Sequence, residues 1–95
     1  MTASGEQGPP LNAAPGAPVA GEILVNALGH HCPVPTLRLR RALEQAGPGA
    51  VARLLADDPM ARIDVPHFAA QAGFQLIESG PLSPAGLFFV VSRPA

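Results

Sequence analysis

The chain has a single thiol, Cys32, which lies in the segment GHHCPVP at residues 29–35. A short β-branched stretch precedes the segment, and a stretch with a strong helical pattern follows it. The first N–H groups of a helix and the positive end of its dipole stabilise an anion. We therefore expect a sulfur anion, either a thiolate or a persulfide, to be favoured at Cys32.

The alternative for Cys32 is burial without chemistry, because free cysteine often behaves as a small core hydrophobe. Two histidines before it and two prolines after it make a core position unfavourable. With one cysteine, no disulfide can form within a monomer. We expect Cys32 to be accessible to solvent, directly before the first helix.

The flanking residues suggest supporting roles. Gly29 ends the preceding strand, while Pro33 and Pro35 stiffen the start of the helix and hold Cys32 outward. His30 and His31 could lower the thiol pKa or donate hydrogen bonds to sulfur. The alternative is that both are solvated loop residues. Three consecutive residues rarely complete a tetrahedral metal shell, and His67 stands outside any ligand spacing, so we expect no metal.

The helical pattern extends over residues 33–46 and ends at Gly47-Pro48-Gly49. Leu37 falls on its exposed arc with Arg38 and Arg41, which predicts a protein-docking surface. Two alternatives remain open. The face could be simply solvated, with an Arg40–Glu44 pair, or the loop over residues 80–86 could cover Leu37.

Four strands are predicted, at residues 23–27, 50–56, 74–79 and 87–92. Between the second and third, a helical turn is expected over 59–63. Pro66 should then break the helix, and a second segment should run over 66–72. Asp58 and Asp64 are the expected caps of these two segments, and this structural role is preferred over an acid–base pair of Asp57 and Asp58.

The order of elements is thus βαβαββ, which predicts an α+β fold. The simplest compact solution is a two-layer α/β sandwich, a four-stranded mixed sheet with two helices packed on one face. A right-handed crossover makes the first two strands parallel.

Composition sets further bounds. Residues 1–21 hold four Pro, four Gly and one charged residue, so we expect a flexible Pro/Gly/Ala-rich tail before a single domain over 22–95. The net charge of −1 does not favour direct nucleic-acid binding. No apolar stretch suits a signal peptide or a membrane span, so we expect a cytoplasmic monomer that does not bind membranes.

The chain resembles the TusA/SirA family of small sulfur carriers over residues 23–92. The matching segments are Asn26 to Gly29, Cys32 to Pro35, the arginine-bearing helix through Leu43, Gly47 to Gly49, Asp57 to Pro59, and Asp64 to Phe68. The resemblance implies a two-layer α/β sandwich. It also implies a cysteine that receives sulfur as a persulfide and passes it on.

As a carrier-type sulfurtransferase, the chain would accept sulfur from a cysteine desulfurase or a rhodanese-like donor. The resemblance offers tRNA thiolation, molybdenum-cofactor biosynthesis and sulfur oxidation as destinations. No phosphate-binding loop, nucleotide motif or metal cluster is evident, so we expect no cofactor. The alternatives are an interaction or regulatory module that retains Cys32 without transfer, and a redox sensor that dimerises through it.

Overall fold

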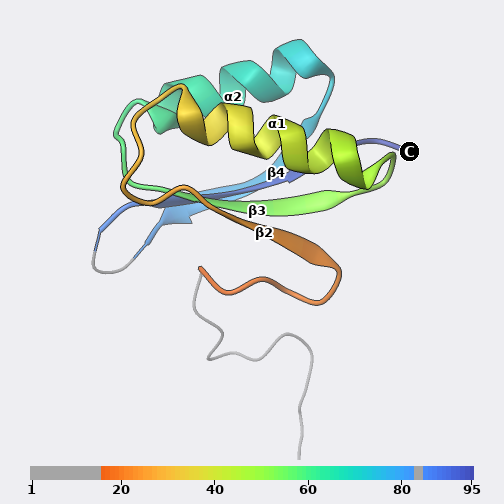
Figure 1. Ribbon diagram of the computed structural model, residues 1–95, viewed down its shortest axis with the longest axis horizontal. Helices are drawn as coiled ribbons and strands as arrows, with labels where there is room; N and C mark the ends of the chain where they lie inside the picture. Colours follow the sequence, from red (N-terminus) through yellow and green to blue (C-terminus); the bar gives the residue numbers. More distant parts are fainter. Residues whose placement is uncertain (1–15, 83–84) are drawn as a thin grey trace, which may run out of the picture.

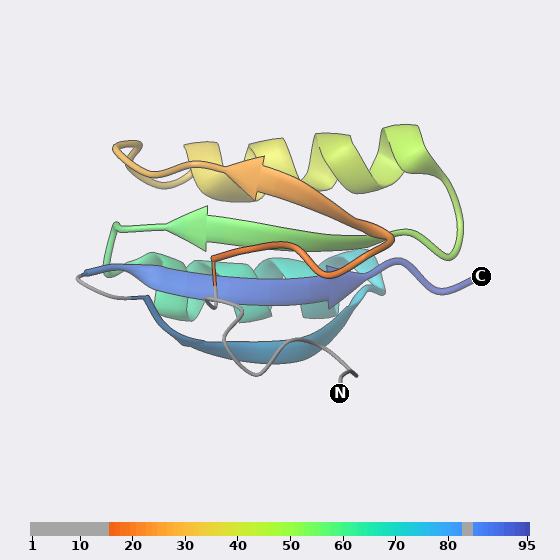
Figure 2. The same ribbon diagram turned by 90° about the horizontal axis from the view of Figure 1, so that it is seen from below.

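One mixed sheet joins all four strands. The computed structural model describes residues 16–82 and 85–95. The strands are β2 (Glu22–Asn26), β3 (Val51–Ala56), β4 (Gln75–Pro81) and β5 (Leu87–Ser92), in the order β2-β3-β5-β4. Figure 2 shows this order across the sheet, with β4 at one edge. β2 and β3 are parallel and the other two pairs are antiparallel, as a crossover followed by a hairpin requires.

Both helices lie on the same face of the sheet (Figure 1). α1 (Val34–Ala46) packs against β2 and β3, and α2 (Ala61–Ala72) packs against β4 and β5. The core between the two layers is built from β-branched, Leu, Ala and Phe side chains. Its fully enclosed members include Leu39, Leu43, Leu54, Val65 and Val91. The predicted two-layer α+β sandwich with βαβαββ order is confirmed.

The predicted break at Pro66 is wrong, because α2 continues through this residue as one helix. A proline removes one backbone donor, so the carbonyl of Arg62 loses its usual i+4 partner. Ala61, Val65 and Ala69 form a buried stripe on both sides of the proline. Burial of that stripe against the sheet outweighs the lost hydrogen bond and keeps the helix continuous.

The face of the sheet opposite the helices has its own smaller cluster, formed by Leu55, Phe88 and Val90. The Arg53 guanidinium lies over the Phe88 ring at 5.2 Å and pairs with Glu22 at 2.8 Å. That hydrogen bond holds the pKa of Glu22 below its usual value. The chain from residue 16 to β2 runs across this face (Figure 2), while residues 1–15 of the predicted tail lie outside the described residues.

The parallel pairing of β2 and β3 positions the chemistry-bearing segments. Parallel strands end at the same edge of a sheet, so the loop after Asn26 and the loop after Ala56 are neighbours. The first of these loops carries Cys32, and the second carries Asp57 and Asp58. No helix in the described part of the chain is long and apolar enough to cross a bilayer.

Candidate functional site

The cysteine loop, which we define as residues 27–33, is held by hydrogen bonds to the end of β3 and to the residue that follows it. The N–H of Ala27 donates to the carbonyl of Leu55 at 2.8 Å, which extends the parallel pairing by one step. Beyond it, Asp57 Oδ2 accepts the Gly29 N–H at 2.9 Å. These contacts fix the loop over the carboxyl end of the sheet.

Asp58 binds two segments of backbone at once. Its Oδ2 accepts the Cys32 N–H at 2.9 Å, and its Oδ1 accepts the Met60 N–H at 2.9 Å. These two bonds hold the pKa of Asp58 below its usual value, and the bond to Met60 has the larger effect. Their contribution to stability is therefore present above the ordinary aspartate pKa and is lost as the pH falls through the lowered one. We call Asp57 and Asp58 the carboxylate pair.

Turn geometry gives the cysteine loop its shape. Asn26 Oδ1 accepts the Leu28 N–H at 3.0 Å, a short-range turn contact that an aspartate would also supply. Gly29 has a φ of 84°, in the left-handed region that favours glycine. A side chain at this position would strain the loop that the carboxylate pair holds.

Cys32 is half-buried at the start of α1, and its side chain packs against the main core. Pro33 is the N-cap and Val34 is the first helical residue, so Cys32 precedes the helix by one residue more than expected. Pro35 is fully buried beneath the first turn. The thiol is thus neither a free surface group nor a sealed core group.

The prediction that the start of the helix stabilises a sulfur anion at Cys32 is wrong for the resting protein. Pro33 and Pro35 have no N–H, and the Val34 N–H donates to the His31 carbonyl at 3.0 Å. Two of the first-turn donors are therefore missing, and a third is already used.

The surroundings of the sulfur instead favour the neutral thiol. Burial raises the pKa of Cys32 to about 11, helped by a hydrogen bond to Asp64 and by the charges of Asp64 and Asp58. Asp64 lies in the first turn of α2, rather than capping the segment expected after it. At pH 7.5, such a pKa leaves about one thiol in a few thousand ionised.

The two histidines have different surroundings. His31 is 95% exposed, and its Nδ1 lies 3.5 Å from Asp58 Oδ2, so its partner is a carboxylate rather than sulfur. His30 is half-buried, and its backbone N–H donates to the Ala27 carbonyl at 3.2 Å. His67 is exposed on α2. Within the described ranges, no three His, Cys, Asp or Glu side chains gather as a metal site would require.

Leu37, Arg38 and Arg41 are exposed on α1, as the sequence predicts. Leu37 is 58% exposed, and with Val34, Arg38 and Arg41 it lines a shallow depression of about 300 Å³. Arg38 also donates to the Asn26 carbonyl at 3.3 Å, which ties it to the start of the cysteine loop. The Arg40–Glu44 pair forms at 3.1 Å, as the alternative supposed.

The loop over residues 80–86 does not provide a cover for Leu37 in its described part. Leu82 packs against the opposite face of the sheet, on the cluster that contains Leu55 and Phe88. The centre of this loop, residues 83–84, lies outside the described residues.

Sequence reasoning missed what the acidic residues hold. The structural role preferred for Asp57 and Asp58 is confirmed, because both accept backbone N–H groups, but the local sequence does not indicate that these groups belong to the cysteine loop. Asp64 lies in the first turn of α2, where its charge acts on the thiol. The parallel order of the first two strands was a signal that could have found the carboxylate pair, since residues after adjacent parallel strands meet at one edge.

Replacing Asp58 with Asn should loosen the cysteine loop more than replacing Asp57 with Asn. Asp58 uses both oxygens, on Met60 and Cys32, whereas an asparagine has only one. Asp57 uses one oxygen on Gly29, which an asparagine can still supply. Amide hydrogen exchange at Cys32 should therefore accelerate in Asp58→Asn and stay near the wild-type rate in Asp57→Asn. Equal rates in the two variants would contradict the double role of Asp58.

Replacing Asp64 with Asn should lower the pKa of the Cys32 thiol, because a charge and a strong acceptor beside it are removed. Burial remains, so the pKa should stay above its ordinary value. Each unit of decrease raises the thiolate fraction about tenfold. The rate of iodoacetamide alkylation, measured from pH 7 to 11, should show the lower midpoint. Glu44→Gln, on the far part of α1, is the control. The same alkylation midpoint in Asp64→Asn and Glu44→Gln would show that Asp64 does not act on the thiol.

Comparison with known proteins places this arrangement in a family. A family model described as Sulfurtransferase TusA matches residues 23–91. A protein of Archaeoglobus fulgidus is 39% identical over 67 residues, covering 70% of this chain and 87% of its own. The sulfur carrier protein TusA of Allochromatium vinosum is 38% identical over 55 residues, covering 58% of this chain and 72% of its own.

The fold comparison agrees with the sequence comparison. The crystal structure of a SirA-like protein from Desulfitobacterium hafniense superposes with a TM-score of 0.69 at 27% identity, covering 77% of this chain and 99% of that one. The family model spans all four strands and both helices, including the cysteine loop and the carboxylate pair. The chain therefore belongs to the TusA family of sulfurtransferases.

Proposed function

We propose that this protein carries sulfur as a persulfide on Cys32, taking it from a donor protein and relaying it to an acceptor protein. The observation that carries the proposal is the half-buried thiol of Cys32, whose backbone N–H is held at the carboxyl edge of the sheet by Asp58. Named sulfur carriers among its relatives support the same role. The activity is that of a carrier-type sulfurtransferase.

The transfer balances without an external oxidant or reductant. The Cys32 sulfur attacks the outer sulfur of the donor's persulfide, and an S–S bond forms at Cys32 as the donor's S–S bond breaks. The donor cysteine leaves as a thiolate and takes up the proton that Cys32 loses. In delivery, a nucleophile of the acceptor attacks the outer sulfur, the S–S bond at Cys32 breaks, and the Cys32 thiolate takes up the proton that the nucleophile loses.

The raised pKa of Cys32 places a condition on this chemistry. The resting thiol is almost entirely protonated, so ionisation has to accompany docking of the donor. Asp64, whose charge acts on the thiol, is the group proposed to take the proton in passing, before the leaving donor cysteine receives it. After transfer, Asp64 and Asp58 disfavour a persulfide anion in the same place, which promotes its delivery.

The proposed partners follow from the site. A cysteine desulfurase or a rhodanese-like protein presents a persulfide and is the class of donor that fits. Leu37, Arg38 and Arg41, which we call the α1 surface, lie on the helix that begins beside Cys32 and offer such a partner an apolar contact within a basic rim. A reducing cytoplasm is the compartment in which a lone thiol remains available.

Exposure to a persulfide donor should add one sulfur to Cys32, measured by intact-mass spectrometry. The adduct should vanish on reduction with dithiothreitol and should be absent from Cys32→Ser. A wild-type protein that never gains the sulfur would favour an interaction module instead. A disulfide-linked dimer on a non-reducing gel, without the adduct, would favour a redox sensor.

Replacing Leu37 with Asp should slow sulfur delivery and leave the fold intact. The side chain is 58% exposed, and surface substitutions usually change stability by less than about 0.5 kcal/mol. Leu39→Asp is the matched control, because Leu39 is fully buried two residues away and a charge there should unfold the domain. Thermal melts and transfer rates to a candidate acceptor measure the two effects. Unfolding of Leu37→Asp, or transfer at the wild-type rate, would place the docking surface elsewhere.

A further inference from the structure

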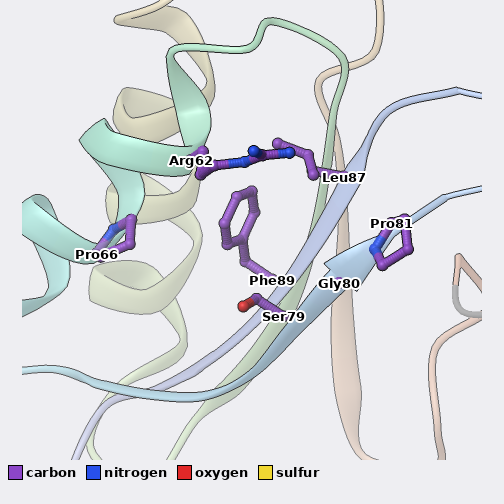
Figure 3. Close-up of a pocket in the computed structure, with 7 residues that line it drawn as sticks. All are labelled: Arg62, Pro66, Ser79, Gly80, Pro81, Leu87 and Phe89. Carbon is purple, nitrogen blue, oxygen red and sulfur yellow. The ribbon is translucent and has the colours of Figure 1, made fainter.

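A second concave site lies between α2 and the edge strand β4, on the side of α2 away from α1. Its volume is about 400 Å³, at the lower end of the range for small-ligand pockets. Figure 3 shows the residues that line it: Arg62, Pro66, Ser79, Gly80, Pro81, Leu87 and Phe89. We call this hollow the β4 pocket.

The β4 pocket exists because β4 presents little bulk to the helix. Strand pairing opposes Ser79 to Phe89 and Pro81 to Leu87, so these residues share the helix-facing side of the sheet. Gly80 lies between them and faces the other way, where it abuts Phe88. Short side chains at the edge thus leave a hollow beside the Phe89 ring, although Phe89 itself is a core residue with an exposed fraction of only 3%.

Apolar side chains dominate the wall, and one cation stands at its rim. Pro66, Pro81, Leu87 and Phe89 supply the apolar surface. Arg62 extends from the first turn of α2 toward the strands (Figure 3). Within the part of the chain that the structure describes, its guanidinium makes no hydrogen bond or ion pair. No lining residue is acidic, so the unpaired charge favours an anionic group beside an apolar one.

The β4 pocket is connected to the cysteine loop. Leu87 follows Gly86, which packs against Asp57, and Asp57 in turn holds Gly29. On α2, Arg62 faces the pocket while Asp64 faces the thiol, so the helix separates the two sites. A helix is roughly 10 Å across with its side chains, and one docked protein can span that distance.

We propose that the β4 pocket binds a partner protein through an apolar side chain with an adjacent carboxylate, such as a chain end of the form Leu-COO⁻. The side chain lies against Phe89 and Leu87, and the carboxylate pairs with Arg62. The identity of this partner, the protein that exchanges sulfur with Cys32, rests on the proposed function. The existence of the pocket and the chemistry of its ligand do not depend on the proposed function.

The test uses the ¹⁵N-labelled full chain and the probe N-acetyl-glycyl-leucine, titrated at low salt and neutral pH. Saturable shifts should appear at the amides of Arg62, Ser79, Gly80 and Leu87. The probe's C-terminal amide should bind at least tenfold more weakly, because it removes the charge that Arg62 recognises. Acetate alone should also bind weakly, because it lacks the apolar group.

Two variants locate the interaction. Arg62→Gln should weaken binding of the acid about tenfold or more and leave binding of the amide unchanged. Ser79→Asp should do the same by repelling the carboxylate. Arg40→Gln, on α1 and outside both the pocket and the α1 surface, is the control with the same loss of charge and should bind the probe as the wild type does. Each variant should keep the dispersed spectrum of a folded protein.

The proposal is overturned if the probe's C-terminal amide or acetate binds with the same affinity as the probe. It is also overturned if the backbone amide shifts are confined to other surfaces, or if no backbone amide shifts up to about 20 mM probe. Shifts at these amides on raising the protein concentration alone would assign the pocket to a second copy of the chain. Sulfur loading of Cys32 from a small persulfide donor is measured separately in Arg62→Gln, where it should match the wild type. A result against the proposed ligand of the β4 pocket can therefore be told apart from a result against the proposed carrier function.

Discussion

The geometry of the site depends on the carboxylate pair at the end of β3. Asp57 and Asp58 accept N–H groups from Gly29 and Cys32 and so join two loops that are far apart in the sequence. Asp58 also holds the turn that leads into α2, so the same side chain positions the thiol and the helix that carries Asp64. Charged acceptors make stronger hydrogen bonds to backbone donors than neutral ones. The cysteine loop is thus tied to the folded domain by hydrogen bonds, although most of its residues are exposed.

This arrangement gives the thiol an environment with two consequences. Partial burial and two nearby carboxylates favour the neutral thiol, which is a weaker nucleophile than the thiolate. The same features allow a docked protein to change its reactivity, since excluding water and adding positive charge would alter the balance that favours the neutral thiol. A carrier that meets several partners benefits from a thiol that reacts when a partner is bound.

The fold was predictable from the sequence because local patterns and topology rules agreed. Strand-like stretches, the amphipathic helix and Gly/Pro punctuation indicated βαβαββ, and handedness then fixed the parallel pair. The continuity of α2 through Pro66 is not predictable from the local pattern, because the tertiary burial of Ala61, Val65 and Ala69 decides it.

At the site, Cys32 was identified from its setting, but its ionisation was misjudged. A helix start usually offers N–H groups to an anion, and Pro33 and Pro35 remove two of them. The opposing charges come from Asp58 and Asp64, which lie 26 and 32 positions farther along the chain. Contacts of this kind depend on register and packing, which the local pattern around a cysteine does not contain. The β4 pocket was missed for the same reason, since it results from small residues on one strand facing a helix.

The two prolines at the start of α1 also affect which molecules compete for the site. Helix N-termini with unused N–H groups attract phosphate and sulfate, which are abundant in cells. Here the Val34 N–H is engaged by His31, Pro33 and Pro35 offer none, and Asp58 and Asp64 add negative charge. Inorganic oxyanions therefore find little to bind at this helix start.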